Sequence, residues 1–491
     1  MPVLASASSL RDSTEGSCVR DCDSGFFEGR MSSGSEEAQC VEAFKRMLYT
    51  MQNVRRTIVE RILNECEVDE ADVDALDKAL QELTDSRTSG EMRHISTPAA
   101  NFPINIRDEI RGLRDAVILS SSAPDTRRKD CEFLHRLSKV TSKSPMIENA
   151  LDQIQLDTIL APYHPESPKK FEEELQDAER FLMDFVDSAY SGVKPLLVTD
   201  WDGTMKDYCS QYATNLQTKL DLVILSESLQ PVYSAVVMGR FAELFTRATA
   251  VLTAGPLRGP GILDLTALPI NGPVLFSGSW GREWWLRGRR VVHEDGISEE
   301  GFDAIGRLSD EMTDLLEDSS FAQFALVGSG VQRKVDRLTL GVQTVFGHVP
   351  LELVVRYIDA IKERIHRVDP NNANLVLENS SPLEIEVCAH NSGAVWNKGD
   401  GVASLIESLH DSLKNGKVLV AGDTTSDLPM LQHAVSENPD GVMALFVGAG
   451  ESLRESVQSI VGDESRVCFV SCPDVVHAAF ARVLAAKVEL D

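Results

Sequence analysis

The sequence predicts an α/β protein whose main domain is a doubly wound parallel sheet. Short apolar runs alternate with helical patterns from residue 195 onward, and two of these runs end in acidic residues. Such alternation is typical of parallel strands that are joined by helices. Ligands bind to these sheets at the carboxyl ends of the strands, which is where the acidic residues would lie. An inserted α+β cap domain and an amino-terminal helical bundle complete the predicted architecture.

The amino-terminal region shows helical periodicity but no cluster of chemical groups. Residues 1–35 are predicted to be a disordered tail, because Ser, Gly and charged residues dominate and few apolar anchors occur. Within 36–190, apolar residues recur at three- and four-residue steps in segments that begin at Val41, Val73, Ile106 and Phe171. We predict a small helical bundle and a linking helix. Their expected roles are packing, binding of a protein partner, or self-association.

The core is predicted in two parts, residues 191–281 and 394–491, because strand-like runs lie on both sides of a segment with a different pattern. The predicted core strands are 195–199, 250–253, 274–276, 418–420, 444–447 and 467–470, and a helix is predicted over 402–413. The intervening residues 282–393 have strand-like runs at 324–327, 338–340, 375–377 and 383–387, and a helical pattern over 354–365. We therefore predict that 282–393 is an α+β cap lying over the catalytic site.

The composition excludes several classes of partner. The formal net charge is −28 and the pI is near 4.8, which argues against nucleic acid or an anionic membrane as the main partner. No apolar run reaches the length of about 18 residues that a membrane span needs, and the first residues lack a signal-peptide pattern. The nine cysteines are scattered, so we expect reduced thiols in a cytoplasmic protein and no zinc site.

The most informative stretch is Asp200-Trp-Asp-Gly-Thr204, which follows the predicted strand 195–199. Alternate side chains of an extended segment point the same way, so the carboxylates of Asp200 and Asp202 are expected in one pocket. A second acidic stretch, 422–427, follows the predicted strand 418–420. One carboxylate can attack phosphorus, a second can move protons, and clustered carboxylates suit Mg²⁺. The sequence thus predicts a phosphoryl-transfer site.

Two further side chains are expected at this site. Thr253 ends the predicted strand 250–253, and Lys398 begins the predicted helix that precedes the second acidic stretch. A hydroxyl and an ammonium group would complete a clamp on a phosphate. Taken singly, each residue has a plainer interpretation, because an Asp at a strand end often caps a helix and a lysine is usually a solvated charge. The whole set in this order favours the catalytic interpretation.

This ordered set resembles the haloacid dehalogenase (HAD) phosphotransferase superfamily. The resemblance implies roles for six residues: Asp200 as nucleophile, Asp202 as acid and base, Thr253 and Lys398 as phosphate contacts, and Asp423 with Asp427 as the acidic fourth motif. It also implies that metal is held by Asp200, the backbone carbonyl of Asp202, Asp423 and Asp427. The position of the cap, between the second and third motifs, resembles the C2 type.

Longer segments resemble the trehalose-6-phosphate phosphatases, and above all their nematode branch. They include VLTAGPL at 251–257, FSGSWGRE at 276–283, GVQRK at 330–334 and HRVDP at 366–370. That branch also carries an amino-terminal helical domain resembling a MIT bundle. The resemblance implies hydrolysis of trehalose 6-phosphate with Mg²⁺, through an aspartyl-phosphate intermediate.

The resemblance also implies cap residues that contact the sugar, foremost Gln332, Lys334, Glu386 and Arg367, and after them Arg333 and His366. Because neighbouring residues of a strand point in opposite directions, Gln332 and Lys334 are expected on one face and Arg333 on the other. Three tryptophans near the first cap junction are expected to fill a hinge or core rather than to stack on a sugar: Trp280, Trp284 and Trp285.

Two departures from the family pattern stand out. Thr424 occupies the place of a second adjacent aspartate, which leaves Asp427 either as a metal ligand or as the group that orients Lys398. Residues 218–230 form an extra segment, whose effect on the loop after Thr204 the sequence does not decide. Two alternative functions remain open: a phosphatase of another sugar phosphate, and a catalytically weak scaffold that acts through the helical domain.

Overall fold

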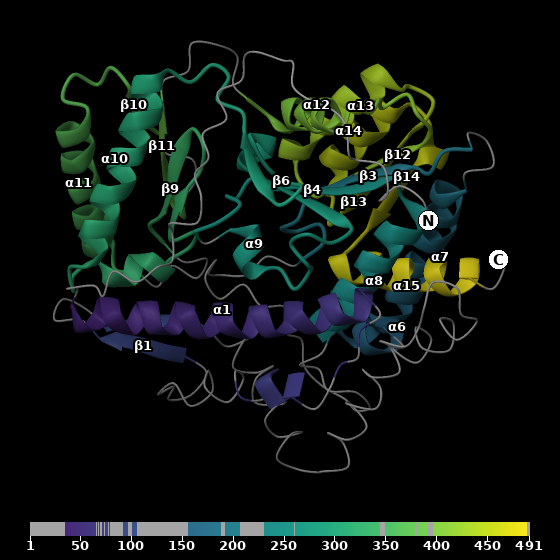
Figure 1. The fold of residues 1–491 in the computed structure, drawn as a ribbon, viewed down its shortest axis with the longest axis horizontal. Coiled ribbons are helices and arrows are strands. Elements are labelled where there is room, and N and C mark those ends of the chain that lie inside the picture. Colours follow the sequence, from purple (N-terminus) through teal and green to yellow (C-terminus); the bar gives the residue numbers. More distant parts are fainter. Residues whose placement is uncertain are drawn as a thin grey trace, which may run out of the picture.

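The computed structural model describes residues 35–64, several positions between 66 and 78, and the ranges 92–96, 101–105, 156–187, 192–206, 230–259, 261–343, 349–378, 382–389 and 396–488. Within these ranges the chain forms a large core, a smaller cap beside it, and a long amino-terminal helix that runs beneath both (Figure 1). The predicted tail, the predicted helix from Ile106 and residues 218–229 of the extra segment lie outside the described residues.

The core is an eight-stranded sheet with the strand order β14–β13–β12–β3–β4–β5–β6–β7. The strands from β14 to β5 are parallel, while β6 and β7 add to the edge in antiparallel fashion. The parallel strands are β3 Leu196–Thr199, β4 Ala248–Leu252, β5 Val274–Gly278, β12 Val418–Gly422, β13 Val442–Val447 and β14 Val467–Val470. All six predicted core strands are therefore confirmed, because runs this short and this apolar suit strands buried on both faces.

Helices cover both faces of the core sheet. Alternate residues of the strands belong to two separate apolar clusters, as Leu197 and Val198 do on β3. One face packs on α7 Pro168–Val186, α8 Gln230–Phe245 and α15 Pro473–Val488, and the other on α12 Lys398–Leu409, α13 Leu428–Glu437 and α14 Glu451–Val461. The doubly wound prediction is thus confirmed, and so is the linking helix, whose apolar residues from Phe171 to Phe185 are buried.

The cap contains a four-stranded antiparallel sheet with the order β10–β11–β9–β8 and two helices on one side of it (Figure 1). Its elements are β8 Val331–Arg333, β9 Arg337–Gly341, β10 Leu375–Glu378, β11 Glu384–Ala389, α10 Glu299–Leu316 and α11 Leu351–Val368. The predicted strand 324–327 is wrong, because residues 322–326 form a 3-10 helix, η5. The core-sheet strands β6 Glu283–Leu286 and β7 Arg289–Val292 fall inside the predicted cap range.

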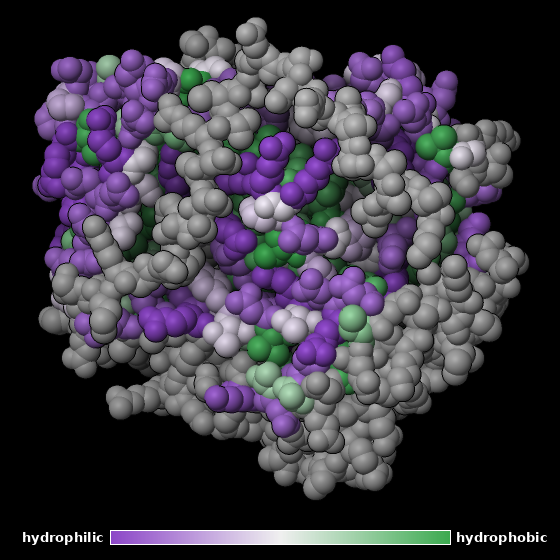
Figure 2. All heavy atoms as spheres, in the orientation of Figure 1, coloured by the Kyte–Doolittle hydropathy of each residue, from purple (hydrophilic) through white to green (hydrophobic). Residues whose placement is uncertain are grey.

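The face of the cap seen in Figure 2 is mostly hydrophilic, in keeping with the acidic composition. Apolar side chains of the cap sheet instead point to α10 and α11, and include Leu338, Leu340, Ile385 and Val387. On β9 and β11 these residues alternate with Arg337, Thr339, Glu384 and Glu386. One face of the cap sheet is therefore polar, and it is turned away from the cap helices.

Helix α1, Glu36–Leu63, connects the two domains. At 28 residues it is about 42 Å long, taking about 1.5 Å per residue. At its start, the backbone N–H of Ser35 donates to the carbonyl of Glu317 in the cap, over 3.0 Å. Near its end, Arg56 Nη2 donates to the carbonyl of Leu263 in the core over 2.6 Å, and Arg240 donates to the carbonyl of Ile62 over 3.0 Å. The buried apolar residues of α1 belong to the same hydrophobic cluster as those of the cap and of one face of the core sheet.

Other parts of the amino-terminal region are described only in short pieces. The helix predicted from Val73 is seen at scattered helical positions up to residue 78. Strands β1 Met92–Ser96 and β2 Asn101–Asn105 pair as an antiparallel hairpin, which the sequence did not predict. Among the cysteines whose side chains the structure describes, none forms a disulfide; these are Cys66, Cys388, Cys468 and Cys472. Within the described residues, no helix has both the length and the apolar character of a membrane span. The cytoplasmic compartment stays a prediction.

Candidate active site

Three neighbouring strands bring the predicted catalytic residues to one edge of the sheet. In the strand order, β3 lies between β12 and β4. Asp200 follows β3, Asp423 follows β12 and Thr253 follows β4, and all three strands run parallel. The topology therefore gathers these residues at the carboxyl edge, where a doubly wound sheet binds its ligand.

Asp200, the predicted nucleophile, is held in a tight turn that residues 200–206 form around one carbonyl group; we call these residues the nucleophile loop after that prediction. The carbonyl of Trp201 accepts from the backbone N–H groups of Met205 and Lys206, over 2.9 and 3.1 Å. The turn needs a left-handed backbone at Gly203, whose φ is +88°. Its closure brings the hydroxyl of Thr204 to 3.2 Å from Asp200 Oδ2.

Lys398 approaches the other oxygen of Asp200 from the first turn of α12. Its Nζ lies 2.6 Å from Asp200 Oδ1 and 2.5 Å from Asp427 Oδ1. Only 2% of Lys398 is exposed, so the predicted surface alternative for this lysine is wrong. Burial alone would lower the pKa of Lys398, but Asp200 and Asp427 outweigh it and raise this pKa, so the ammonium stays charged.

Asp427 is a supporting residue as well as a member of the acidic cluster. Its Oδ2 accepts from the backbone N–H groups of Asp423 and Thr424, each over 2.9 Å. Its Oδ1 contacts Lys398, so both oxygens are engaged. A side chain at Gly422 would place its Cβ 2.5 Å from the Cβ of Asp427, which is why a glycine precedes Asp423. The geometry favours the second of the two predicted roles, in which Asp427 orients Lys398.

The acidic cluster fits a divalent cation. Asp200, Asp423 and Asp427 each offer an oxygen, and these oxygens lie within 4.8 Å of one another. Three carboxylates and the ammonium of Lys398 carry a formal charge of −3 + 1 = −2, which a divalent cation would neutralise. Burial, together with the negative charges of Asp427 and Asp423, outweighs the opposing charge of Lys398 and raises the pKa of Asp200 to about 8. A cation would favour the ionised form of Asp200.

The side chain of Asp202 points elsewhere. Its Oδ1 lies 3.0 Å from Nζ of Lys206, and Asp202 is not one of the three residues whose oxygens converge. The structure therefore does not bring this carboxylate to Asp200, although its backbone lies in the same loop. The proposed metal contact through the Asp202 carbonyl stays a prediction.

Thr253 is linked to the cap junction through the segment 279–281. Its hydroxyl accepts from the backbone N–H of Gly255 over 3.1 Å, and its carbonyl accepts from that of Trp280 over 3.0 Å. The segment has three successive positive φ angles, at Ser279, Trp280 and Gly281. At Gly281 an added Cβ would lie 2.4 Å from Gly401 on α12, so the turn packs directly on the helix that bears Lys398.

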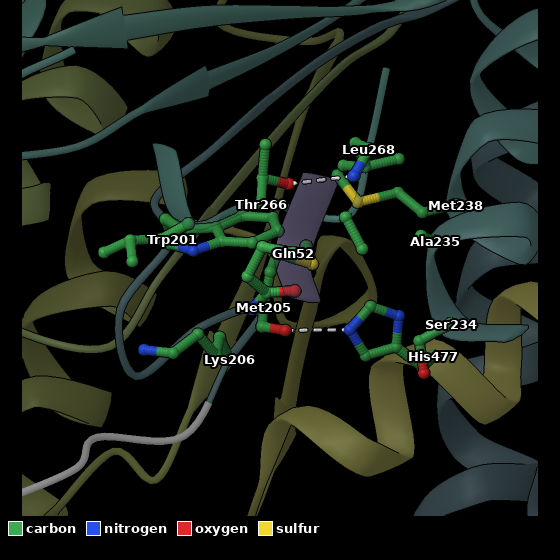
Figure 3. A pocket seen from close by; sticks show the side chains of 12 residues that line it. Gln52, Trp201, Met205, Lys206, Ser234, Ala235, Met238, Thr266, Leu268 and His477 are labelled. Atoms are coloured by element: carbon green, nitrogen blue, oxygen red, sulfur yellow. Dashed lines mark hydrogen bonds between the residues drawn. The ribbon is translucent and has the colours of Figure 1, made fainter. Parts of the chain in front are cut away.

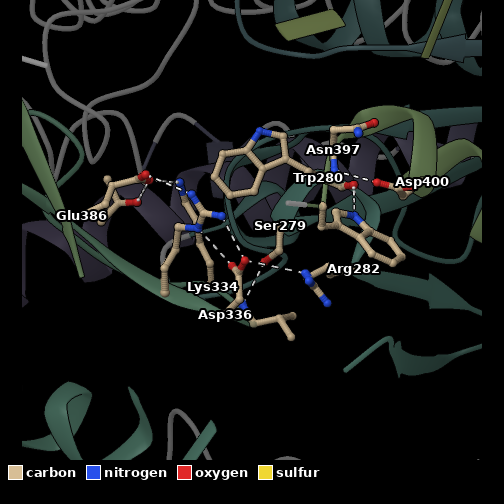
Figure 4. Close-up of polar contacts among 12 residues, drawn as sticks. Ser279, Trp280, Arg282, Lys334, Asp336, Glu386, Asn397 and Asp400 are labelled. Atoms are coloured by element: carbon tan, nitrogen blue, oxygen red, sulfur yellow. Dashed lines mark hydrogen bonds and ion pairs between the residues drawn. The ribbon is translucent and has the colours of Figure 1, made fainter. Parts of the chain in front are cut away.

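A polar cluster on the cap faces this segment (Figure 4). Glu386 Oε1 accepts from the hydroxyl of Thr339 over 2.8 Å and lies 3.4 Å from Lys334 Nζ, and Glu386 Oε2 lies 3.1 Å from Arg337 Nη1. Both cations lie over the ring of Trp280, at 4.5 Å for Lys334 and 4.3 Å for Arg337. Burial lowers the pKa of Lys334. Gln332 pairs with Thr339 across the sheet and is also buried.

Two predicted sugar contacts lie away from this cluster. Arg333 points to the other face of the cap sheet, where its guanidinium lies 5.2 Å from the ring of Phe302 on α10. The alternation prediction for residues 332–334 is thus confirmed. Arg367 lies on α11, is 58% exposed and pairs with Glu311 over 2.5 Å, and its neighbour His366 is exposed too. The structure does not bring Arg333, His366 or Arg367 to the polar cluster.

Sequence reasoning missed Arg337, Thr339 and the role of Trp280. Arg337 and Thr339 could have been found from strand alternation, since they share a face of β9 opposite Glu386. Of the three tryptophans expected in a hinge or core, Trp284 is fully buried, as predicted. Trp285 donates to Asn271 over 2.9 Å. Trp280 instead presents its ring to the cap cations, because the left-handed backbone turns it outward.

Comparisons with known proteins cover most of the chain. A family model described as trehalose-6-phosphate phosphatase, C-terminal, matches residues 197–476, and one for the N-terminal helical bundle domain of this family matches residues 40–137. The trehalose-phosphatase of Caenorhabditis elegans is 56% identical over 91% of this chain and 96% of that protein. The trehalose-phosphatase of Brugia malayi is 55% identical over 92% of this chain and 87% of that protein.

A solved structure of the trehalose-6-phosphate phosphatase from Aspergillus fumigatus is similar over 63% of this chain and 97% of that chain, with a TM-score of 0.32 and 14% sequence identity. The predicted doubly wound core with an inserted cap is confirmed by the sheet order, and the predicted amino-terminal helical bundle by the second family match. Because these matches include every acidic motif that the fold gathers at one edge, the chain belongs to the trehalose-phosphatase family.

Proposed function

We propose that this protein hydrolyses trehalose 6-phosphate to trehalose and phosphate. The observation that carries the proposal is the convergence of Asp200, Lys398 and Asp423 at one sheet edge, beside a cap with a polar face. The acidic edge and the ammonium suit a phosphate and its counter-ion. The polar face of the cap suits the many hydroxyls of a disaccharide, because buried polar groups discriminate strongly for a ligand that can bond them.

In the proposed reaction, a carboxylate oxygen of Asp200 attacks phosphorus and the bond from phosphorus to the sugar oxygen breaks. Asp202 gives its proton to that leaving oxygen, and then takes a proton from the water that attacks the aspartyl-phosphate. Phosphate leaves and Asp200 is restored. Lys398 holds negative charge on the phosphoryl oxygens, and the Thr253 hydroxyl donates to one of them. The Asp202 side chain must turn from Lys206 to act, since the two are paired.

We propose Mg²⁺ as the resident cation. Its ligands would be the carboxylates of Asp200 and Asp423 and the backbone carbonyl of Asp202. Asp427 would not bind the cation directly and would orient Lys398. Oxygen donors of this kind suit a small hard cation. When bound, the cation would polarise the phosphoryl group and neutralise the carboxylates around it.

We propose that Gln332, Lys334, Arg337 and Glu386 contact the sugar. They share one face of the cap sheet, and the ring of Trp280 lies beneath the two cations. Arg333 and Arg367, which the family resemblance also suggested, are placed outside this set. Their side chains bond or pack elsewhere in the cap.

The test is phosphate release from a panel of sugar phosphates, with and without Mg²⁺. Trehalose 6-phosphate is expected to be turned over far better than sucrose 6-phosphate or glucose 6-phosphate, and only with the cation. Asp200→Asn should keep the fold, judged by circular dichroism, and lower phosphate release by roughly a factor of 10⁴ or more, because the attacking oxygen is lost. Comparable turnover of several sugars would favour a broader sugar phosphatase.

A scaffold role without catalysis is the other candidate. Lys398 is buried and contacts two carboxylates, which favours catalysis. Burying charged groups costs free energy of folding, so a buried cluster of this kind is expected where it has a function. A protein partner for the amino-terminal region is a further proposal. The apolar side of α1 already packs on this chain, so such a partner would bind other residues of that region.

A further inference from the structure

The nucleophile loop has a second anchor outside the catalytic edge. His477, on the last helix α15, lies with its Nε2 at 2.8 Å from the carbonyl oxygen of Met205 (Figure 3). A carbonyl can only accept, so Nε2 carries the proton and donates. Both residues are buried, with exposures of 3% for His477 and 1% for Met205. A hydrogen bond in such surroundings is strong, because water does not compete for it.

The loop itself explains why this anchor matters. At its start, the backbone N–H of Asp200 donates to Ala421 on β12 over 2.9 Å, which fixes the loop to the sheet. The bonds around the Trp201 carbonyl then fold the loop on itself without tying it to the rest of the core. Met205 directly follows Thr204, whose hydroxyl contacts Asp200. His477 therefore holds the far end of the loop, one residue away from a group that touches the nucleophile.

A cavity beside the loop gives it room to shift if this bond is lost. The cavity has a volume of about 40 Å³, and Trp201, Met205, Lys206 and His477 are among the residues that line it. Gln52 of α1 closes another side (Figure 3). Van der Waals packing alone does not fix the position of the nucleophile loop on the side of the cavity, because the atoms there have no contacting neighbours. The hydrogen bond supplies the missing restraint.

The packing of α15 holds His477 in a fixed position. Apolar residues on both sides of His477 are buried, among them Val476, Ala478, Phe480 and Leu484. The ring of His477 meets that of Phe480 edge-on at 6.4 Å, and Phe480 packs on Phe241 of α8 at 4.3 Å. A histidine held this way has little freedom to follow a moving loop.

We infer that His477 is a positioning residue for the phosphatase reaction, which holds the nucleophile loop through the Met205 carbonyl. The inference rests on the proposed function, because its effect is read in phosphate release. His477 touches no reacting atom. Its loss would misplace the Thr204 hydroxyl and the Asp202 backbone relative to Asp200. It would leave the cap, where the sugar is proposed to bind, unchanged.

The test compares three variants at saturating Mg²⁺. His477→Phe keeps an aromatic ring against Phe480 and removes the donor, so kcat is expected to fall by about 10- to 100-fold, as a misplacement on the ångström scale does. KM for trehalose 6-phosphate should stay within about twofold, because ground-state contacts are kept. His477→Gln restores an N–H donor with a similar reach and should recover most of kcat. His477→Asn is too short and should not.

The matched control is His164→Phe, which removes another buried histidine far along the chain, where it pairs with Glu174 over 3.4 Å. It is expected to lower the unfolding midpoint without lowering kcat per folded molecule. Wild-type kcat for the Phe variant, or equal kcat for the Gln and Asn variants, would overturn the inference. If the Phe variant does not fold, the Gln and Asn pair decides alone. Absence of phosphate release by the wild type would instead refute the proposed function.

Discussion

Nζ of Lys398 lies 2.5 Å from Oδ1 of Asp427, a carboxylate with no exposed surface. Lys398 is the first residue of α12, and Asp427 is the last residue of the 3-10 helix at 425–427. Their pairing fixes the ammonium where it also meets Asp200. Asp427 thus contacts the lysine, which leaves Asp423 as the residue of the acidic fourth motif that we propose for the cation.

Asp427→Asn should thus damage folding as well as activity. The amide oxygen of an asparagine can still accept from the N–H groups of Asp423 and Thr424, but its NH₂ group would then face the ammonium of Lys398, which loses a charged partner. We expect a free energy of unfolding lower by about 2 to 4 kcal/mol, measured by urea denaturation. Asp423→Asn is the comparison, and without Mg²⁺ it should not lose stability, because one of three mutually repelling carboxylates is removed. Equal losses in both variants would contradict the division of tasks.

The acidic cluster should also make stability depend on Mg²⁺. A ligand that binds only the folded state adds about 2.7 kcal/mol when present at 100 times its dissociation constant. The thermal midpoint of the wild type is therefore expected to rise on addition of MgCl₂ and to fall back with a chelator. NaCl at matched ionic strength is the control for screening. The rise should be much smaller in Asp423→Asn, and an undiminished rise there would place the cation elsewhere.

Lys334→Met is expected to raise KM for trehalose 6-phosphate at least about tenfold, because the change removes a buried charged group that we propose as a donor to the sugar. Arg367→Met is the matched change, since it also replaces a cap cation by an apolar chain of similar length. Arg367 is exposed on α11 and pairs with Glu311, so its KM should equal that of the wild type. Steady-state kinetics on both variants checks this, and the reverse ranking would move the sugar site to α11.

Glu386 should make the stability of the cap depend on pH. Burial alone would raise the pKa of Glu386, but Lys334, Arg337 and the Thr339 hydroxyl outweigh it and hold this pKa below its ordinary value of 4.5. The ionised form is therefore favoured in the folded state, and its contribution is complete above pH 4.5 and is lost as the pH falls through the lowered pKa.

Thermal midpoints of the wild type and of Glu386→Gln, measured from pH 7 down to pH 3, check this sign. The wild type should be the more stable protein at pH 7, and the gap should close towards pH 3. A gap that stays constant would mean that the carboxylate charge of Glu386 does not contribute.

Much of the core could be predicted from the sequence, for a physical reason. A strand buried on both faces is a short apolar run, and in a chain where such runs alternate with helical patterns, a run such as 418–420 is typical of a buried strand. The run 324–327 misled the prediction, because a buried 3-10 turn is equally apolar and nothing in its four residues distinguishes the two. Alternation in a strand correctly separated Arg333 from its neighbours.

The rest depended on contacts between distant parts of the chain. The direction of the Asp202 side chain is set by Lys206, and that of Trp280 by a left-handed turn packed on Gly401. Neither is visible in a local pattern. Arg367 was suggested by family resemblance, and only the tertiary placement of α11 shows that it lies apart from the polar cluster.

Helix α1 makes the amino-terminal region inseparable from the enzyme. Its residues Met51, Ile58, Val59 and Ile62 are almost fully buried, and Leu63 fits against Gly239 so closely that a Cβ there would lie 2.6 Å from it. A truncated protein that starts at the linking helix α7 would lose α1, which contacts both the cap and the core. It would also expose the apolar residues of the core that α1 covers. We expect such fragments to aggregate, so inhibitor screening should use the chain with α1 intact.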